Sequence, residues 1–287
     1  MAIKIDGTAL ANQVNETTLN RVVEMSKRGR VPGLAVVLVG NDHASQIYVQ
    51  NKERTAKKLG IHSEVIRLPE STTQRELLDQ VNELNMAPAI DGILVQFPLP
   101  AHLDEVEVTR TILPEKDVDG FHPDNLGRLF EGDHGSFPVA CTPQGIMTML
   151  ESVKTPLKGQ NAVVVGRSKI VGRPMSALLL RADATVTIAH RYTPADVLPV
   201  YTRNADILIV ATGIYHLITA DMVKPGATVI DVGMDRDPDG KLAGDVDYFE
   251  VEKKVRAISP VPGGVGPMTI ATLMKQTVDL AEWHEER

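Results

Sequence analysis

The sequence is poor in the features that mark exported, membrane-spanning or nucleic-acid-binding proteins. Its single cysteine, Cys141, excludes an intramolecular disulfide and a thiolate metal cluster. No apolar run approaches the roughly 20 residues of a transmembrane helix, and residues 1–8 lack the apolar core of a signal peptide. Lysine and arginine total 30 against 37 acidic residues, so the formal charge is −7 and the pI about 5.6. This balance gives no electrostatic footprint for nucleic acid or an anionic membrane, and we expect a cytoplasmic protein.

The chain also has no internal repeat and no low-complexity tract. Its hydrophobic fraction of 43% and charged fraction of 23% are ordinary for a globular protein, which excludes collagen-like, disordered and coiled-coil classes. The 287 residues correspond to about two domains at roughly 150 residues each. A chain of this length can bury substantial cores without a disulfide or a metal.

Short apolar segments alternate with longer amphipathic ones. The short segments are too brief for buried helices and rich in β-branched residues, which favours strands at 34–39, 93–95, 162–165, 185–188, 207–210 and 228–232. Helices are predicted at about 43–59, 73–84 and 173–182. The second could begin with a capping box of Ser71 with Gln74 or of Thr73 with Glu76. This alternation predicts an α/β protein with parallel sheets built from right-handed βαβ units.

The rhythm of strands and helices is interrupted between about residues 98 and 160, where prolines and glycines are frequent. A second series starts at Val163, so we place a domain boundary near residue 140. A glycine-rich turn at 260–267 precedes a final helix from about Thr269, which could pack on either domain.

Residues 163–174 form a candidate phosphate-binding turn. A predicted strand leads into Gly166, a six-residue turn reaches Gly172, and Pro174 suits the first turn of a helix. Glycines let the backbone approach a pyrophosphate, and a helix N-terminus attracts anions. The spacing is not the common G-x-G-x-x-G, so a tight strand-to-helix turn without a ligand remains the alternative.

The end of the next predicted strand carries His190 and Arg191 instead of the acid usual for NAD. Asp183 precedes that strand, at its wrong end. Together with Arg167 in the turn, Arg191 suits the 2′-phosphate of NADP. The alternative is that Arg191 is an ordinary surface residue.

Tyr48 and Lys52 are four residues apart on a predicted helix and share one face. Desolvation can lower the pKa of a lysine until it serves as a base near neutrality. The pattern alone is weak, and an exposed amphipathic helix is the alternative. Short-chain dehydrogenases also contain Tyr-x-x-x-Lys, but after the nucleotide-binding turn. Here the motif precedes that turn by more than 100 residues, which disfavours a short-chain dehydrogenase.

Three further segments place polar groups or glycines where a ligand could bind. Gln96 follows a predicted strand, at the end where α/β sheets bind ligands. Asp117 and Asp119 occupy a polar turn that could equally be solvated. The glycines of 260–267 permit close approach to a flat ligand, or could belong to a linker.

In this order the segments closely resemble the bifunctional methylenetetrahydrofolate dehydrogenase/cyclohydrolase family, over nearly the whole chain. The matching motifs are Tyr48-Val-Gln-Asn-Lys52, Asp91-Gly-Ile-Leu-Val-Gln-Phe-Pro-Leu-Pro100, Lys116-Asp-Val-Asp-Gly-Phe121, Cys141-Thr-Pro-Gln-Gly145, Gly166-Arg-Ser-Lys-Ile-Val-Gly172 and Pro262-Gly-Gly-Val-Gly-Pro-Met-Thr269.

The resemblance implies an enzyme of one-carbon metabolism and purine biosynthesis. It would oxidise 5,10-methylenetetrahydrofolate with NADP and hydrolyse the methenyl product to 10-formyltetrahydrofolate. The implied fold has two α/β domains with a cleft between them: a folate-binding catalytic domain at 1–140, to which the helix 269–287 returns, and a Rossmann-type NADP-binding domain at 141–268. The implied assembly is a homodimer formed through the nucleotide-binding domain.

The resemblance also implies roles for individual residues. Lys52, Tyr48 and Gln96 would be catalytic, and Asp119 would hold the pterin beside the turn of Pro262, Gly263 and Gly264. The cofactor would be bound by Gly166, Arg167, Ser168, Val171, Gly172, Arg191, Thr212 and Gly213. No metal is expected, because the nitrogen lone pairs of the folate stabilise the cation formed on hydride loss, and the protein mainly positions two rings.

The sequence departs from the family pattern in two places. Many members carry Lys-Pro or a similar pair where this chain has Ile214, Tyr215 and His216, a difference that could alter how the nicotinamide half is held. The residue before Cys141 is commonly proline and here is Ala140. Other possibilities are a dehydrogenase without cyclohydrolase activity and a non-catalytic nucleotide-binding regulator, both disfavoured by the intact Lys52, Gln96 and Asp119. A two-domain amino-acid dehydrogenase would bring a lysine-rich polar site, which the sequence lacks.

Overall fold

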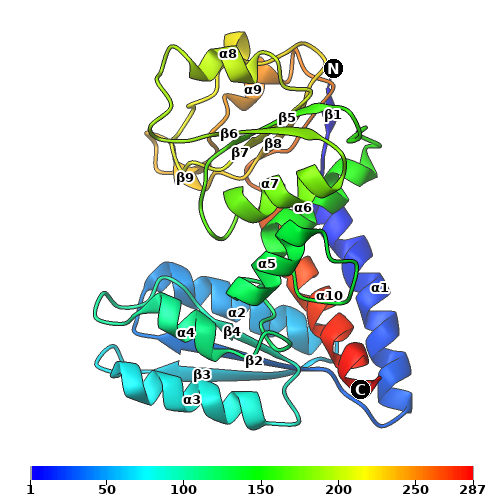
Figure 1. Cartoon of the computed structure of the whole chain (residues 1–287), viewed down its shortest axis with the longest axis vertical. Helices are drawn as coiled ribbons and strands as arrows, with labels where there is room; N and C mark the ends of the chain where they lie inside the picture. Colours follow the sequence, from blue (N-terminus) through cyan, green and yellow to red (C-terminus); the bar gives the residue numbers. More distant parts are fainter. Residues whose placement is uncertain (1, 287) are drawn as a thin grey trace. The chain divides into compact units, whose positions relative to one another are not determined.

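The computed structural model describes residues 2–286, which form two compact units, both discontinuous in sequence. The catalytic-side unit, as we call it from here on, consists of residues 13–141 and 270–286, and the nucleotide-side unit consists of residues 2–12 and 142–269. Each contains a sheet whose strands all run parallel (Figure 1). The predicted α/β class with parallel sheets is therefore confirmed.

The catalytic-side unit has a three-stranded sheet in the order β3-β2-β4. Its strands are β2 (Gly33–Val39), β3 (His62–Leu68) and β4 (Gly92–Val95). The helices that contribute to this unit are α1 (Gly7–Lys27), α2 (His43–Lys58), α3 (Gln74–Met86), α4 (Glu105–Thr111), α5 (Pro123–Glu131) and α10 (Val265–Glu285).

Strand β2 is buried on both faces, which is why its sequence is a continuous apolar run rather than an alternating one. Its even-numbered residues, including Leu34 and Val36, pack with α2 and α10. Its odd-numbered residues, including Ala35 and Val37, pack with α3 and α4. Helices α2 and α3 accordingly lie on opposite sides of the sheet (Figure 1).

The nucleotide-side unit has a six-stranded sheet in the order β1-β11-β8-β7-β5-β6. Its strands are β1 (Ile3–Lys4), β5 (Asn161–Val165), β6 (Thr185–Ala189), β7 (Ile207–Val210), β8 (Thr228–Asp231) and β11 (Ala257–Ile258). Its remaining elements are α6 (Cys141–Ser152), α7 (Gly172–Arg181), α8 (Leu198–Thr202), α9 (Tyr248–Val251), the 3₁₀ helix η1 (Ala220–Met222) and the antiparallel pair β9 (Asp235–Arg236) and β10 (Leu242–Ala243).

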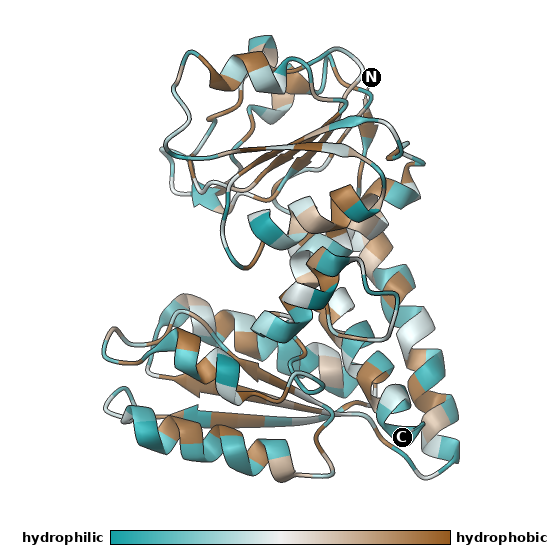
Figure 2. Cartoon of the chain, in the orientation of Figure 1, coloured by the Kyte–Doolittle hydropathy of each residue, from teal (hydrophilic) through white to brown (hydrophobic). Residues whose placement is uncertain are grey.

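The central strands of both sheets are mainly hydrophobic, whereas the helices carry both hydrophilic and hydrophobic residues (Figure 2). In the nucleotide-side unit the chain passes from β5 to its neighbour β6 and then returns to the other side of β5 as β7. This reversal of direction creates a switch point at the carboxyl end of β5. Open α/β sheets bind ligands at such points, and Gly166 follows β5 directly.

Two element boundaries refine the sequence prediction. The capping box of α3 is formed by Thr73 and Glu76: the Thr73 N–H donates to Glu76 Oε2 at 2.8 Å, and Glu76 N–H donates to Thr73 Oγ1 at 3.3 Å. The prediction that the last helix starts at about Thr269 is wrong by four residues, because α10 begins at Val265. Pro267 is tolerated there, since the N–H groups of the first turn have no partner within the helix.

Within residues 2–286, no helix combines the length and apolar composition that crossing a membrane requires. The same residues contain no group of three or more histidine, cysteine or acidic side chains arranged to hold a metal ion.

Candidate active site and cofactor site

Lys52 is buried on α2, with 9% of its surface exposed. Its ammonium donates a hydrogen bond to Gln96 Oε1 at 3.0 Å. Gln96 follows β4, and its amide N–H donates to its neighbour's carbonyl, Phe97 O, at 2.7 Å, which fixes the amide with its oxygen toward the lysine. The two residues are far apart in sequence, and the pairing of β4 with β2 brings them together.

Burial also changes the acid–base properties of this helix. Desolvation lowers the pKa of Lys52, and the nearby charge of Asp119 opposes this effect. Tyr48 lies one turn earlier on the same face, half-buried, and desolvation raises the pKa of its phenol. A lysine with a lowered pKa is more readily available as the neutral amine near neutral pH.

Asp119 lies in the turn that follows α4. Ile93 N–H of β4 donates to Lys116 O at 2.7 Å and holds this turn beside the strand that leads to Gln96. The adjoining Asp117 is buried and accepts hydrogen bonds from His122 N–H at 2.7 Å and Asn125 Nδ2 at 3.0 Å. Asp117 therefore stabilises the turn itself, and Asp119 is the acid of this pair that can have another role.

Protein atoms surround the Asp119 carboxyl closely enough that desolvation raises its pKa to about 6. The positive charge of Lys52 limits this rise, and Asp117 adds to it. Asp119 also borders a small hollow of about 220 Å³, open space included, whose other lining residues are mostly apolar: Ile93, Leu94, Val95, Phe97, Thr109, Ile112, Asp117 and Phe121. An amine, an amide and a carboxylate thus meet in one unit, and together they can bind a polar heterocycle and move protons.

Cys141 belongs to the same cluster, a role that its sequence motif did not indicate. The thiol is buried and donates to Val118 O at 3.3 Å. Burial raises its pKa well above the usual range, and the carboxylate of Asp119 adds to the effect while Lys52 opposes it. At neutral pH, Cys141 is therefore a neutral thiol and not a nucleophile.

The turn of Pro262, Gly263 and Gly264 belongs to the nucleotide-side unit. Gly263 O accepts a hydrogen bond from Thr8 N–H at 3.1 Å, so the turn packs on the start of α1. A Cβ on Gly264 would lie 2.4 Å from Pro260 O, which explains the glycine without any ligand. Its predicted contact with folate stays a prediction.

The predicted phosphate turn is a tight connection from β5 to α7. Gly166 has φ of +132°, and a Cβ there would lie 2.3 Å from Ala211 O, so no other residue fits without a backbone shift. The Ser168 hydroxyl accepts hydrogen bonds from the N–H groups of Val171 at 3.1 Å and Gly172 at 3.4 Å, which stabilises the start of the helix. The turn stands at the switch point where a nucleotide is expected.

Arg167 and Arg191 come from different segments but meet at one aromatic ring. Their guanidinium carbons lie 5.4 Å and 4.9 Å from the centroid of Tyr192, and Arg191 also donates to the Tyr192 hydroxyl at 3.1 Å. Two cations at the end of β6 fit the 2′-phosphate of NADP. Arg167, Arg191 and Tyr192 are all exposed, so the binding of the 2′-phosphate by the two arginines stays a prediction.

The loop after β7 contains Thr212 and Gly213, and a buried carboxylate that sequence reasoning missed determines its shape. Asp245 Oδ2 accepts from Thr212 N–H at 2.6 Å, Thr212 Oγ1 at 2.9 Å and Gly213 N–H at 3.3 Å, and Oδ1 accepts from Ile214 N–H at 3.0 Å. Asp231 in turn accepts from the N–H of Asp245 at 3.0 Å. Burial raises the pKa of Asp231 to about 7, and three main-chain donors limit the rise.

Comparisons with known proteins agree with this geometry. The profile of the tetrahydrofolate dehydrogenase/cyclohydrolase catalytic domain matches residues 5–119, and that of the NAD(P)-binding domain of the same family matches residues 140–285. Bifunctional protein FolD from Levilactobacillus brevis is 60% identical over 287 residues, covering 100% of this chain and 99% of its own. The protein of that name from Lactiplantibacillus plantarum is 58% identical, covering 98% of both chains.

Two solved structures extend the similarity to three dimensions. The bifunctional FolD enzyme of Campylobacter jejuni is 45% identical with a TM-score of 0.96, covering 99% of this chain and 100% of its own. The FolD enzyme of Trypanosoma brucei, complexed with NADP cofactor and inhibitor, is 36% identical with a TM-score of 0.96, covering 100% and 99%. The predicted enzyme class is confirmed, and this chain belongs to the tetrahydrofolate dehydrogenase/cyclohydrolase family.

Proposed function

We propose that this enzyme oxidises 5,10-methylenetetrahydrofolate to the methenyl form with NADP and then hydrolyses that product to 10-formyltetrahydrofolate. Family membership supports both activities. The observation that carries the second activity is the buried Lys52, bonded to Gln96 at 3.0 Å and near Asp119. A non-catalytic regulator would not need these three polar side chains. An enzyme with dehydrogenase activity alone would need fewer of them.

In this proposal the two units divide the binding work. The catalytic-side unit binds the folate; the sequence predicted this domain at 1–140 with the helix 269–287, whereas residues 2–12 belong to the nucleotide-side unit. The nucleotide-side unit binds NADP, in line with the predicted domain at 141–268. The Asp119 carboxylate accepts hydrogen bonds from the amino and ring N–H groups of the pterin.

NADP supplies the nicotinamide ring that accepts the hydride. We assign its phosphates to the turn of Gly166, Ser168, Val171 and Gly172, which combines close backbone approach with a helix N-terminus. The paired guanidinium groups of Arg167 and Arg191 hold the 2′-phosphate. Thr212 and Gly213, held in place by Asp245, contact the other half of the cofactor.

Hydrolysis requires water to add to the methenyl carbon and to lose a proton. In this scheme neutral Lys52 accepts the proton as the water oxygen bonds to carbon. Gln96 holds the amine in position, and Tyr48 on the same helix face orients the reacting groups. Proton return to the ring nitrogen then allows the carbon–nitrogen bond to break, which gives the 10-formyl product.

Lys52→Met tests the assignment, because methionine keeps the length of the side chain but has no amine. We expect the rate of methenyltetrahydrofolate hydrolysis to fall by at least about 100-fold, the usual contribution of a general base. Lys58→Met, on the exposed side of the same helix, is the matched control and should retain the activity. Hydrolysis by Lys52→Met at the rate of the control would exclude Lys52 as the base.

The proposal also covers the oligomeric state and the cellular location. We propose a homodimer formed through the nucleotide-side unit, since β6 is an outer strand and carries the exposed Ile188, with Leu180 of α7 also exposed. A β edge with apolar side chains favours pairing. Analytical ultracentrifugation tests this proposal, and sedimentation as a monomer at micromolar concentration would exclude it.

The proposed location is the cytoplasm, which fractionation of the source cells tests.

A further inference from the structure

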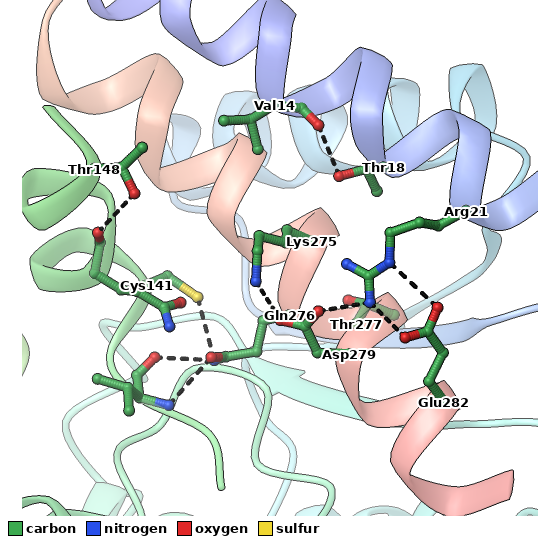
Figure 3. A network of polar contacts seen from close by, with 12 residues as sticks. Val14, Thr18, Arg21, Cys141, Thr148, Lys275, Gln276, Thr277, Asp279 and Glu282 are labelled. Carbon is green, nitrogen blue, oxygen red and sulfur yellow. Dashed lines mark hydrogen bonds and ion pairs between the residues drawn. The ribbon is translucent and has the colours of Figure 1, made fainter. Parts of the chain in front are cut away.

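Gln276 is a buried amide on α10, with 4% of its surface exposed and all its hydrogen bonds directed at one place. Its Nε2 donates to Val118 O at 2.6 Å and to Val139 O at 2.9 Å. Its Oε1 accepts from Val139 N–H at 3.1 Å. Both amide protons and the oxygen are thus used, and Figure 3 shows the side chain reaching from the helix toward Cys141.

The partners of Gln276 belong to two chain segments that contact each other next to Asp119. Val118 lies in one segment and Val139 in the other. Val118 immediately precedes Asp119, and its side chain is fully buried. Gly120, with φ of +70°, lies so close to the other segment that a Cβ there would be 2.4 Å from Val139 C. Gln276 therefore bonds to both sides of a backbone-to-backbone contact next to the carboxylate.

A second donor reinforces the same carbonyl. The Cys141 thiol donates to Val118 O at 3.3 Å, and the Gln276 amide nitrogen lies 3.7 Å from Cys141 Sγ. The peptide that joins Val118 to Asp119 is consequently held by α10 and by the start of α6 together. Neither donor is near enough in sequence to be part of the turn.

We propose that Gln276 is a positioning residue for the folate site: it fixes the peptide preceding Asp119 and so sets the distance of the Asp119 carboxylate from Lys52. This inference rests on the proposed function, because it takes Asp119 as the group that binds the pterin. Gln276 itself touches neither substrate nor cofactor in this scheme. Its effect on catalysis passes entirely through the placement of Asp119.

Gln276→Met in the full-length enzyme removes the amide and nearly preserves the shape. We expect the KM for the folate substrate to rise about tenfold, because a displaced Asp119 carboxylate would lose about one strong hydrogen bond to the pterin. The KM for NADP should stay unchanged within about twofold. Lys52 lowers the pKa of Asp119. An Asp119 displaced away from Lys52 should therefore need a higher pH to ionise. The pH below which folate binding weakens should rise accordingly.

Thr277→Val is the matched control: Thr277 is the next residue of α10, is also buried, and its hydroxyl donates to Leu273 O of its own helix at 2.9 Å. It should lower the thermal midpoint without changing the folate KM or its pH dependence. Gln276→Asn keeps an amide that is one methylene too short. It should fold even if the methionine variant does not, with an intermediate folate KM.

If the folded Gln276 variants keep the wild-type folate KM and pH profile, Gln276 only packs the core and the proposal is wrong. Equal increases in both KM values would also overturn it, because they indicate general loosening. Failure of the proposed function is distinguishable, since wild-type enzyme would then turn over no folate substrate, whatever residue stands at position 276.

Discussion

Folate binding should weaken as the pH falls through about 6, because the binding carboxylate becomes protonated there. Burial raises the pKa of Asp119 to about 6, and the pterin N–H groups require the charged form as acceptor. At pH 7 about nine-tenths of the enzyme carries the carboxylate, and at pH 5 about one-tenth does. The dissociation constant for folate should therefore rise about tenfold between these two pH values.

Asp119→Asn supplies the comparison. The amide is similar in shape but does not titrate, so its folate affinity should be lower at pH 7 and should change less between pH 7 and pH 5. The loss at pH 7 should be about tenfold or more, since a hydrogen bond to a charged group contributes about 1.5–3 kcal/mol. Any ionisation of the ligand affects both proteins equally and cancels in the ratio of their dissociation constants.

The assay is calorimetric titration of each protein with a non-reactive tetrahydrofolate analogue at pH 5, 6, 7 and 8. The ratio of the mutant dissociation constant to that of the wild type should be largest at pH 7 and 8 and should approach one at pH 5. A ratio that stays constant across this range would show that Asp119 does not titrate in it or does not bind the pterin, and the assignment would fail.

Two further predictions concern the cofactor. Arg191→Ala should weaken NADP binding by about tenfold or more and leave NAD binding nearly unchanged, because only NADP carries the 2′-phosphate; dissociation constants at low and moderate salt measure this, and equal losses for both cofactors would contradict it. Asp245→Asn should raise the NADP KM by about tenfold without changing the folate KM, because an amide has one oxygen for the four donors of the Thr212–Ile214 loop. Steady-state kinetics with each substrate varied in turn decides the second prediction, and an unchanged NADP KM would refute it.

The parts of the fold that the sequence predicts are those whose apolar patterns are strong. The buried central strands β2, β5 and β7 are continuous runs of apolar residues and lie where predicted. Strand β3 was not predicted, because it is half-exposed at the sheet edge and carries His62, Glu64 and Arg67. No local pattern separates such a strand from a loop, since its partner β2 supplies its hydrogen bonds.

The same distinction applies to the site. Lys52, Gln96 and Asp119 lie in short motifs, so the sequence indicated them, and the structure brings Lys52 and Gln96 into contact. Gln276 and Asp245 were not indicated, because each acts on main-chain groups that are distant in sequence. A glutamine within a predicted helix gives no sign that its partner is a carbonyl 158 residues earlier. Only the tertiary structure supplies that information.

The interleaving of the two units along the chain bears on how the protein is made and how it can evolve. The core of the catalytic-side unit includes Leu273, Val278 and Ala281 of α10, at the far end of the chain. During translation, residues 13–141 emerge first but lack the helix that covers one face of their sheet until the whole segment 142–269 has also been made. Domains otherwise tend to fold in order from the N-terminus. A gene segment encoding either half would therefore specify an incomplete core, so neither half can be exchanged by simple recombination at the boundary near residue 141.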